Sequence, residues 1–525
     1  MSLFFYLEKG ASLDPGAPCL TIEGTSRSYG EVVELAEAVA RALRHSGVAP
    51  GDKVGILSAN DPTAFTCVFG ISRAGAVWCP INPRNAASEN AELLDLFDCT
   101  TLLFQPAFED LVRKIAPDLP KLTTLVRLGE SDGESDGESD DDGFAPGFAT
   151  WLDAAREDPA REDPAAAAAP PDDVVALVGT GGTTGRPKGV MLTGRNLEVM
   201  SAITLMSYPF EGRPVYLALA PLTHAAGVLC FPVLARGGEV VIMPQPDVGR
   251  FLELVERHRV THTFLPPTLI YLVLGHEALD GTDLSSLQCF WYGAAPMSTA
   301  RLAEALDRIG PMAQLFGQSE APMMISTMSP ADHRRPDGTV HTGRLASAGR
   351  PSPLVTVAIL DGEGNALPQG ERGEICVRGS LVMAGYYRDP EATAEASAHG
   401  WHHTGDIGFL DGEGFLHIVD RAKDMVITGG FNVYSAEVEQ AVLAHDAVRD
   451  CAVIGLPDDK WGERVTAVVQ LRPGAELDTG ELIAFVKDRI GSVKAPKQIE
   501  VWPDLPRSTI GKVLKADIRT TLTAR

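Results

Sequence analysis

The chain has 525 residues, 45% of them hydrophobic and 22% charged, and its formal net charge is −25. This composition excludes a disordered or fibrous protein, and the strong negative charge argues against a nucleic-acid partner because it repels phosphate backbones. The eight cysteines form no CxxC pair and have no histidine cluster beside them, so neither a structural zinc site nor a disulfide framework is expected.

The N-terminal residues have no basic region and only a short apolar run, unlike a signal peptide. No stretch approaches the roughly 18 consecutive apolar residues that a membrane span requires. We therefore expect no integral membrane segment and a cytoplasmic location.

Helix-like and strand-like segments alternate along most of the chain. Residues 28–46 have apolar side chains at helical spacing, and Gly47 ends that helix. Short apolar strands follow, separated by helical stretches such as 298–309, and they are expected at 53–57, 173–179, 215–220, 239–243 and 260–265. This alternation predicts an α/β fold in which helices cover parallel-rich β-sheets.

Two segments interrupt the alternation. GESD occurs three times in tandem from Gly129, and AREDP occurs twice from Ala155, followed by a run of alanines. Such acidic, small and proline-containing sequence cannot bury enough apolar surface to offset the cost of ordering it. We interpret both segments as solvated loops or linkers; an acidic docking site for a basic partner is the alternative.

The character of the sequence changes near Asp420. Beyond it, strand-like segments at 452–455 and 465–471 precede a helix expected at 479–490. This pattern predicts a small α+β unit of about a hundred residues.

The strongest local signal is the segment VGTGGTTGRPKG at residues 178–189, which follows a predicted strand. Its glycines allow a tight turn with several N–H groups pointing inward, its threonines add hydroxyl donors, and a lysine adds positive charge, so the loop is suited to phosphate. It is not a Walker A motif, because Pro187 and Gly189 flank the lysine. The candidate phosphate-binding residues are Thr180, Gly181, Gly182, Thr183, Thr184, Gly185 and Lys188.

With this loop, the sequence resembles the adenylate-forming (ANL) superfamily of acyl-CoA synthetases, peptide-synthetase adenylation domains and luciferases. Further segments continue the resemblance in order, although Gly181 and Ser435 depart from the usual serine and proline. These segments are 222–227 (LTHAAG), 292–296 (YGAAP), 316–320 (FGQSE), 373–386 (from GEICVRG to GY), 401–406 (WHHTGD), 420–424 (DRAKD), 429–433 (GGFNV) and 505–512 (LPRSTIGK).

The resemblance implies a large N-terminal domain over residues 1–420, with parallel-rich sheets and a distorted barrel. It also implies a small mobile C-terminal domain over residues 421–525, with the hinge at residues 420–424 and Lys423 as its pivot. The implied substrates and cofactors are ATP, Mg²⁺, coenzyme A and a small-molecule carboxylic acid, and a homodimer is left open.

The same resemblance implies roles for individual residues. Lys512, Thr184 and Glu320 would be catalytic, and Glu320 would also hold Mg²⁺. His224, Tyr292 and Gly293 would line the acyl pocket, and Gly429 and Gly430 would face coenzyme A. Besides the phosphate loop and Lys512, the ATP-binding residues would be Gly293, Ala294, Ala295, Phe316, Gly317, Gln318, Ser319, Asp406 and Arg421.

Three functions compete within this resemblance. An AMP-forming acid–CoA ligase is favoured over an acyl-AMP ligase or an adenylation enzyme that loads a carrier protein. The third possible function is that of a non-catalytic or luciferase-like protein. A non-catalytic protein is expected to have lost Lys512, Glu320 or Asp406, and all three are present. Residues 221–228 contain no acid to pair with an amino-acid ammonium, whose burial without a partner would be costly. Because residues 224–234 and 264–274 are mostly apolar, a fatty or aromatic acid is favoured.

Overall fold

The computed structural model describes residues 2–129, 143–156, 172–180, 187–222, 225–429, 431–458, 460–507 and 513–523. The GESD repeats and nearly all of the AREDP repeats lie outside these ranges, so their interpretation as loops stays a prediction. Among the described residues, no helix combines the length and apolar character needed to cross a bilayer.

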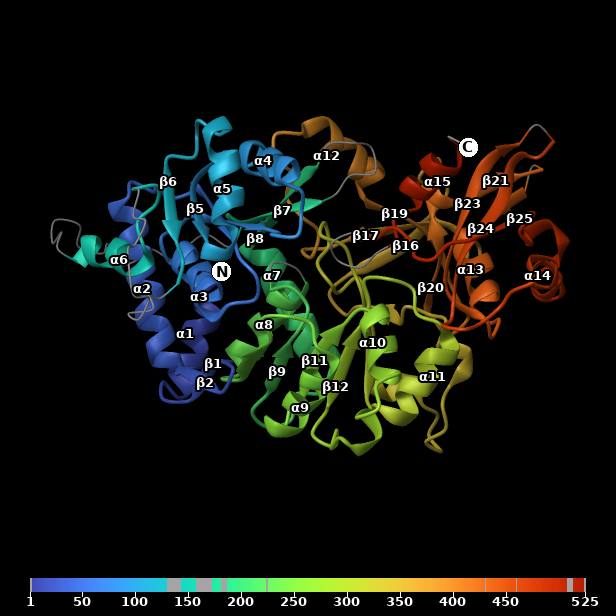
Figure 1. The fold of residues 1–525 in the computed structure, drawn as a ribbon, viewed down its shortest axis with the longest axis horizontal. Helices are drawn as coiled ribbons and strands as arrows, with labels where there is room; N and C mark the ends of the chain where they lie inside the picture. The colour runs from blue at the N-terminus through green and yellow to red at the C-terminus, as the bar shows by residue number, and fades with distance from the viewer. Residues whose placement is uncertain are drawn as a thin grey trace.

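The largest sheet has nine strands, and its centre is parallel (Figure 1). The central strands are short and mostly buried, as expected for strands covered on both faces. The strands in spatial order are β15 (Arg350–Pro351), β14 (Ser326–Met328), β13 (Met312–Phe316), β12 (Cys289–Tyr292), β11 (His262–Leu265), β9 (Val215–Ala218), β10 (Glu239–Ile242), β1 (Pro18–Ile22) and β2 (Thr25–Ser28).

A second sheet of seven strands is also parallel except at one edge, where β8 and β18 run antiparallel. Its strands in spatial order are β18 (Gly385–Tyr386), β8 (Lys188–Thr193), β7 (Val174–Thr180), β4 (Val77–Ile81), β3 (Lys53–Leu57), β5 (Cys99–Phe104) and β6 (Thr124–Arg127). One continuous buried cluster joins the two sheets, since it contains Trp291 of the first and Val54 of the second.

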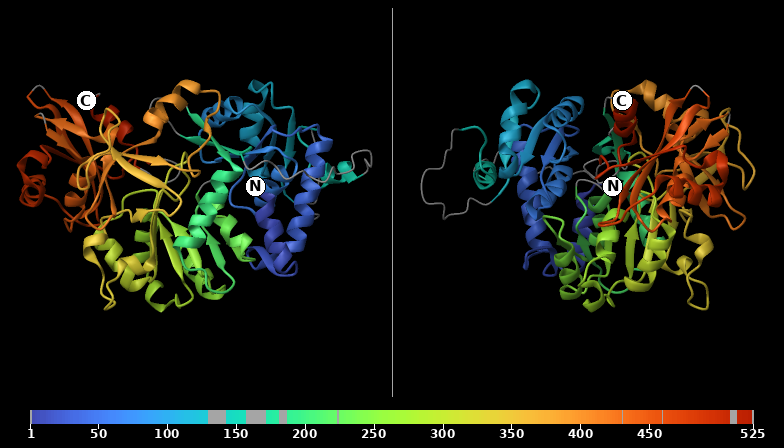
Figure 2. Two further views of the ribbon diagram at one scale, coloured as in Figure 1. Left: turned by 180° about the vertical axis from the view of Figure 1, so that it is seen from behind. Right: turned by 45° about the vertical axis from the view of Figure 1, so that its right-hand side comes forward.

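A third sheet has four antiparallel strands: β16 (Thr356–Leu360), β17 (Gly373–Arg378), β19 (His402–Leu410) and β20 (Leu416–Arg421). The C-terminal region forms a sheet of its own at one end of the molecule, opposite helices α1 and α2 (Figures 1 and 2). Its strands are β21 (Val426–Thr428), β22 (Phe431–Val433), β23 (Val448–Asp458), β24 (Gly462–Leu471) and β25 (Gln498–Val501).

Fifteen α-helices occur within the described ranges. They are α1 (Phe4–Leu13), α2 (Tyr29–His45), α3 (Pro62–Arg73), α4 (Ala87–Leu96), α5 (Glu109–Ile115), α6 (Phe148–Arg156), α7 (Gly194–Ser207), α8 (Ala225–Ala235), α9 (Val248–Arg257), α10 (Pro267–Leu274), α11 (Thr299–Arg308), α12 (Pro390–Ala396), α13 (Ser435–Leu443), α14 (Thr479–Lys494) and α15 (Lys515–Thr523). The predicted helix at 28–46 is α2, and it begins at a capping box in which Ser28 and Glu31 satisfy each other's backbone N–H groups.

The predicted α/β fold, with a large N-terminal part and a smaller C-terminal part, is therefore confirmed. The strand predicted at 53–57 is β3, and the others predicted differ from the observed strands by a few residues at their ends. Helix α1 was not predicted. Its buried Phe4, Tyr6 and Leu7 pack among residues of α2, α3 and α8, and a ten-residue helix of this kind depends on such tertiary contacts.

Candidate active site

The candidate adenine segment begins where β12 ends. Strands β12 and β13 are parallel neighbours that pair Tyr292 with Gln314, so the loops after both strands emerge at the same edge of the sheet, where α/β folds bind ligands. A Cβ atom on Gly293 would lie 2.4 Å from the Leu315 carbonyl oxygen, so only glycine fits there. Ala294 is exposed and has a φ of 65°, a left-handed conformation that alanine rarely adopts.

The loop after β13 turns back sharply. The Gln318 N–H donates to the Ala321 carbonyl at 3.0 Å, and the Ile325 N–H donates to the Phe316 carbonyl at 2.7 Å. A Cβ atom on Gly317 would lie 2.4 Å from the Met323 nitrogen, so this position also requires glycine. The loop is therefore held in one conformation by its own backbone hydrogen bonds and by the close approach at Gly317. Ser319 is half-buried in the same loop.

Glu320 ends this segment and is anchored from a distant strand. Its Oε1 accepts a hydrogen bond of 2.9 Å from the Tyr386 hydroxyl, and its carbonyl accepts one of 2.7 Å from the Met383 N–H. The Lys188 Nζ lies 4.8 Å from the centroid of the Tyr386 ring. Burial, followed by the charge of Glu320, raises the pKa of Tyr386, so its phenol keeps the proton that it donates. Tyr386 therefore joins the predicted metal ligand to the end of the predicted phosphate loop.

Asp406 and Arg421, the two predicted ribose-binding residues, are cross-strand partners on β19 and β20. The Arg421 Nε donates to the Asp406 carboxylate at 2.6 Å, and the Gln318 Nε2 donates to its other oxygen at 3.0 Å. The same Gln318 nitrogen lies 2.7 Å from the Thr404 carbonyl. Asp406 is only 3% exposed. Its carboxylate is thus held in one orientation by the neighbouring strand β20 and by the loop after β13.

Lys423, the predicted pivot, follows Arg421 in the short segment between β20 and β21. Burial lowers the pKa of its ammonium, although the charge of Asp424 acts in the opposite direction. Asp420, at the start of the predicted hinge, accepts hydrogen bonds from the backbone N–H and hydroxyl of Ser435. The predicted hinge is therefore bonded to the N-terminal turn of α13.

Tyr292, which the resemblance assigns to the acyl pocket, is the last residue of β12. Its side chain is 1% exposed and packs in the core on one face of the largest sheet. The hydroxyl lies 2.9 Å from His333 Nε2 and 3.3 Å from Gln314 Oε1. Its role at the acyl pocket stays a prediction.

Several predicted site residues lie outside the described parts of the chain, namely Gly181, Gly182, Thr183, Thr184, Gly185, His224, Gly430 and Lys512. Their roles stay predictions, but the structure fixes what flanks two of these segments. Thr180 pairs with Lys188 across β7 and β8. Arg507 bridges Val513, and the Leu514 N–H donates to the Pro506 carbonyl at 2.8 Å. The described residues on either side of both candidate charge-neutralising segments are therefore paired through their backbones.

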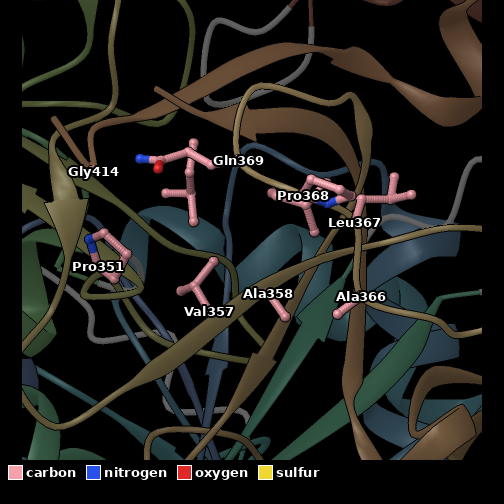
Figure 3. Close-up of a pocket in the computed structure, with 10 residues that line it drawn as sticks. Pro351, Val357, Ala358, Ala366, Leu367, Pro368, Gln369 and Gly414 are labelled. Atoms are coloured by element: carbon pink, nitrogen blue, oxygen red, sulfur yellow. The ribbon is translucent and has the colours of Figure 1, made fainter. Parts of the chain in front are cut away.

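A cavity of about 400 Å³ opens over β16 (Figure 3). Pro351, Val357, Leu367, Gln369 and Leu410 are among its lining residues. None of the predicted ATP-binding or acyl-pocket residues lines this cavity, so the candidate site is placed by the converging side chains alone.

Comparison with known proteins agrees with this geometry. The AMP-binding enzyme family matches residues 7–387, and the AMP-binding enzyme C-terminal domain matches residues 437–512. The chain belongs to the AMP-binding enzyme family.

Individual relatives extend over nearly the whole chain. A medium/long-chain-fatty-acid–CoA ligase, FadD8 of Mycobacterium tuberculosis, is 36% identical over 96% of this chain and 87% of its own length. A feruloyl-CoA synthase from an Amycolatopsis species is 35% identical over 97% and 96% of the two chains. The crystal structure of ATP-bound MatB from Rhodopseudomonas palustris matches with a TM-score of 0.86, at 29% identity, over 100% of this chain and 99% of that one. These matches confirm the predicted class, an AMP-forming acid–CoA ligase that uses ATP, Mg²⁺ and coenzyme A.

Proposed function

We propose that this AMP-binding enzyme activates a fatty or aromatic acid, and that the residues described above carry the reaction. The observation that carries this assignment is the convergence on one site of the Gln318–Asp406–Arg421 network and the Glu320–Tyr386–Lys188 contacts. Support for an apolar acid comes from the aliphatic helices α8 and α10 and from the names of the fatty-acid and feruloyl relatives.

In the first step, a carboxylate oxygen of the acid attacks the α-phosphorus of ATP, and pyrophosphate leaves. The nucleophile needs no general base, because carboxylic acids are ionised near neutral pH. Asp406 and Arg421 would hold the ribose hydroxyls, and the loops at 293–295 and 316–319 would hold the adenine and the α-phosphate. Lys188, the phosphate loop and Lys512 would offset negative charge where it accumulates.

Glu320 is suited to Mg²⁺, which is commonly held by one or two carboxylates together with substrate phosphates and water. Its carboxylate is half-buried, and one oxygen is oriented by Tyr386. When bound there, Mg²⁺ would supply positive charge to the phosphates. This chain's own contribution is the fixed orientation of the carboxylate.

In the second step, the coenzyme A sulfur attacks the acyl carbon of the adenylate, the acyl–oxygen bond breaks, and AMP leaves. We propose that residues 421–525 form a mobile domain that turns about Lys423, removing Lys512 and bringing Gly429 and Gly430 to the site. The position of Lys423 between β20 and β21 supports this boundary, because only residues 422–425 separate the two sheets there.

The assignment is tested by pyrophosphate exchange across a panel of acids, with and without coenzyme A. We expect exchange with apolar acids, and AMP, pyrophosphate and acyl-CoA when coenzyme A is added. ADP and phosphate as products would refute the proposal, and an adenylate that accumulates unchanged in the presence of coenzyme A would favour a carrier protein as acceptor. A homodimer and a cytoplasmic location stay predictions; light scattering would test the first and cell fractionation the second.

A further inference from the structure

Three side chains with metal-binding donors meet on two neighbouring strands outside the ATP site. Glu374 and Cys376 are two residues apart on β17, and Cys376 pairs directly with His403 of β19. The register shifts between Glu374 and Cys376, which leaves β19 with two extra residues. Such a bulge redirects side chains, and here the ligand atoms of all three residues lie within 4.8 Å of one another.

Their separations approach those of a tetrahedral zinc site. The Cys376 Sγ lies 3.5 Å from the His403 Nδ1, and the Glu374 Oε2 lies 2.7 Å from the same nitrogen. With Zn–S near 2.3 Å and Zn–N near 2.0–2.1 Å, tetrahedral angles place sulfur and nitrogen about 3.5 Å apart. The same geometry requires about 3.3 Å between nitrogen and oxygen, so the carboxylate would move by only about 0.6 Å.

Two further hydrogen bonds orient these donors. The His403 Nε2 lies 3.1 Å from the Ala398 carbonyl, and the Gly405 N–H donates to the Glu374 Oε1 at 2.9 Å. A metal-ligating histidine usually donates its second N–H to such a carbonyl. If the neutral His403 ring carries its proton on Nε2, its Nδ1 has a lone pair and no proton. That lone pair then faces the Glu374 carboxylate, which is also a hydrogen-bond acceptor. This arrangement requires either an extra proton or a cation between them.

We propose that Glu374, Cys376 and His403 bind a zinc ion, with a fourth position open to water. A thiolate and an imidazole in one donor set favour zinc over magnesium or calcium. The side chains of His403 and Glu374 are 18% and 27% exposed, which leaves an entry path beside the buried sulfur. The site is separate from the Glu320 carboxylate proposed for Mg²⁺. Sequence spacing could not reveal it, because its ligands come from strands 27 residues apart.

Binding must release protons. Zinc binds the thiolate form of cysteine, so the Cys376 thiol must lose its proton when the metal binds. Zinc forms bonds to the sulfur, the Nδ1 nitrogen and the carboxylate, while the thiol proton and any proton between Nδ1 and Glu374 pass to the buffer. No electron is transferred. Affinity should therefore increase with pH.

Co²⁺ serves as the spectroscopic probe for the full-length protein after chelator dialysis. We expect one equivalent to bind with a thiolate-to-cobalt charge-transfer band and the visible bands of a four-coordinate ion, and Zn²⁺ to abolish both. Cys376→Ser should remove the charge-transfer band. His403→Gln should weaken binding at least about 100-fold, since loss of even an outer hydrogen-bond partner costs about 10–100-fold.

The matched control is Cys289→Ser, which changes another buried cysteine on β12 and should leave the bands unchanged. A wild-type protein without the charge-transfer band would overturn the proposal, and so would a band that survives Cys376→Ser. Thermal melts identify any variant that fails to fold, and the remaining ligand variant then decides the question. The assay contains no ATP or acid, so its result is independent of the proposed ligase reaction.

Discussion

The Gln318 side-chain amide donates to the Asp406 carboxylate across 3.0 Å, although the two residues are 88 positions apart in the sequence. Through this bond the loop after β13 is tied to the strand that carries the proposed ribose ligand. The other Asp406 oxygen is held by Arg421. Asp406 is therefore preorganised for its partner before any nucleotide arrives, which lowers the cost of ordering on binding.

Gln318→Ala should accordingly weaken the binding of ATP more than it slows the chemical step. A hydrogen bond to a charged group contributes about 1.5–3 kcal/mol, so we expect the KM for ATP to rise about 10-fold or more with a smaller change in kcat. Pyrophosphate-exchange kinetics measure both. Gln288→Ala is the matched control, because the Gln288 amide donates to the carbonyl and accepts from the N–H of a single exposed loop residue, Glu211. An unchanged KM for ATP would show that Asp406 does not depend on Gln318.

The sequence predicted the types of element and the main candidate residues, but not the contacts between distant segments. The resemblance predicts that Asp406, Arg421 and Glu320 share one site, and in the structure they lie on neighbouring loops and strands. Tyr386 is the last residue of the 373–386 motif, and nothing in its sequence context indicates that its hydroxyl reaches Glu320. Alternation along β12 places the Tyr292 ring in the same buried cluster as Phe290, and its role at the acyl pocket stays a prediction.

The pKa values of two buried histidines predict how the stability of the fold depends on pH. Burial lowers the pKa values of His262 and His333 to about 4, against 6.5 for an unburied imidazole. Between these two pH values the unfolded chain binds more protons than the native one. The contribution of these histidines to the free energy of unfolding is therefore fully present above pH 6.5 and is lost as the pH falls towards 4. Each histidine should contribute a slope of up to about 1.4 kcal/mol per pH unit in that window.

Urea unfolding at several pH values from 4 to 7 measures this slope. His262→Gln should flatten it, because the side chain then has no proton to bind in the unfolded state. His399→Gln is the control, since His399 is exposed. A slope that is the same in the wild type and in His262→Gln would contradict the assignment.

The GESD segment provides a third prediction. Residues 130–142 contain eight acidic residues and no apolar one. Their deletion should leave pyrophosphate exchange intact and the Tm nearly unchanged, because shortening a loop changes its closure entropy only slightly. Loss of activity in the deletion variant, with an unchanged melt, would instead support the alternative of a functional acidic segment.

The last prediction separates the two half-reactions by their lysines. Lys512 would offset charge during adenylation, so Lys512→Ala should slow pyrophosphate exchange by about 10²–10³-fold, the loss typical of one electrostatic donor. Thioester formation from supplied acyl-adenylate should survive, because the proposed rotation has by then removed Lys512 from the site. The neighbouring Lys515 is not a suitable control, since its ammonium is buried in an ion pair with Glu439 at 2.7 Å.

Lys423→Pro should have the opposite effect. Proline fixes φ near −65°, so a pivot that must change its backbone angles is locked in one state. If that state is the adenylating one, pyrophosphate exchange persists while acyl-CoA formation falls. Lys423→Ala is the matched control, because it removes the ammonium and leaves the backbone free to turn. Equal losses of both half-reactions in the Lys512 and Lys423 variants, with unchanged melts, would indicate a single static site and would contradict the rotation.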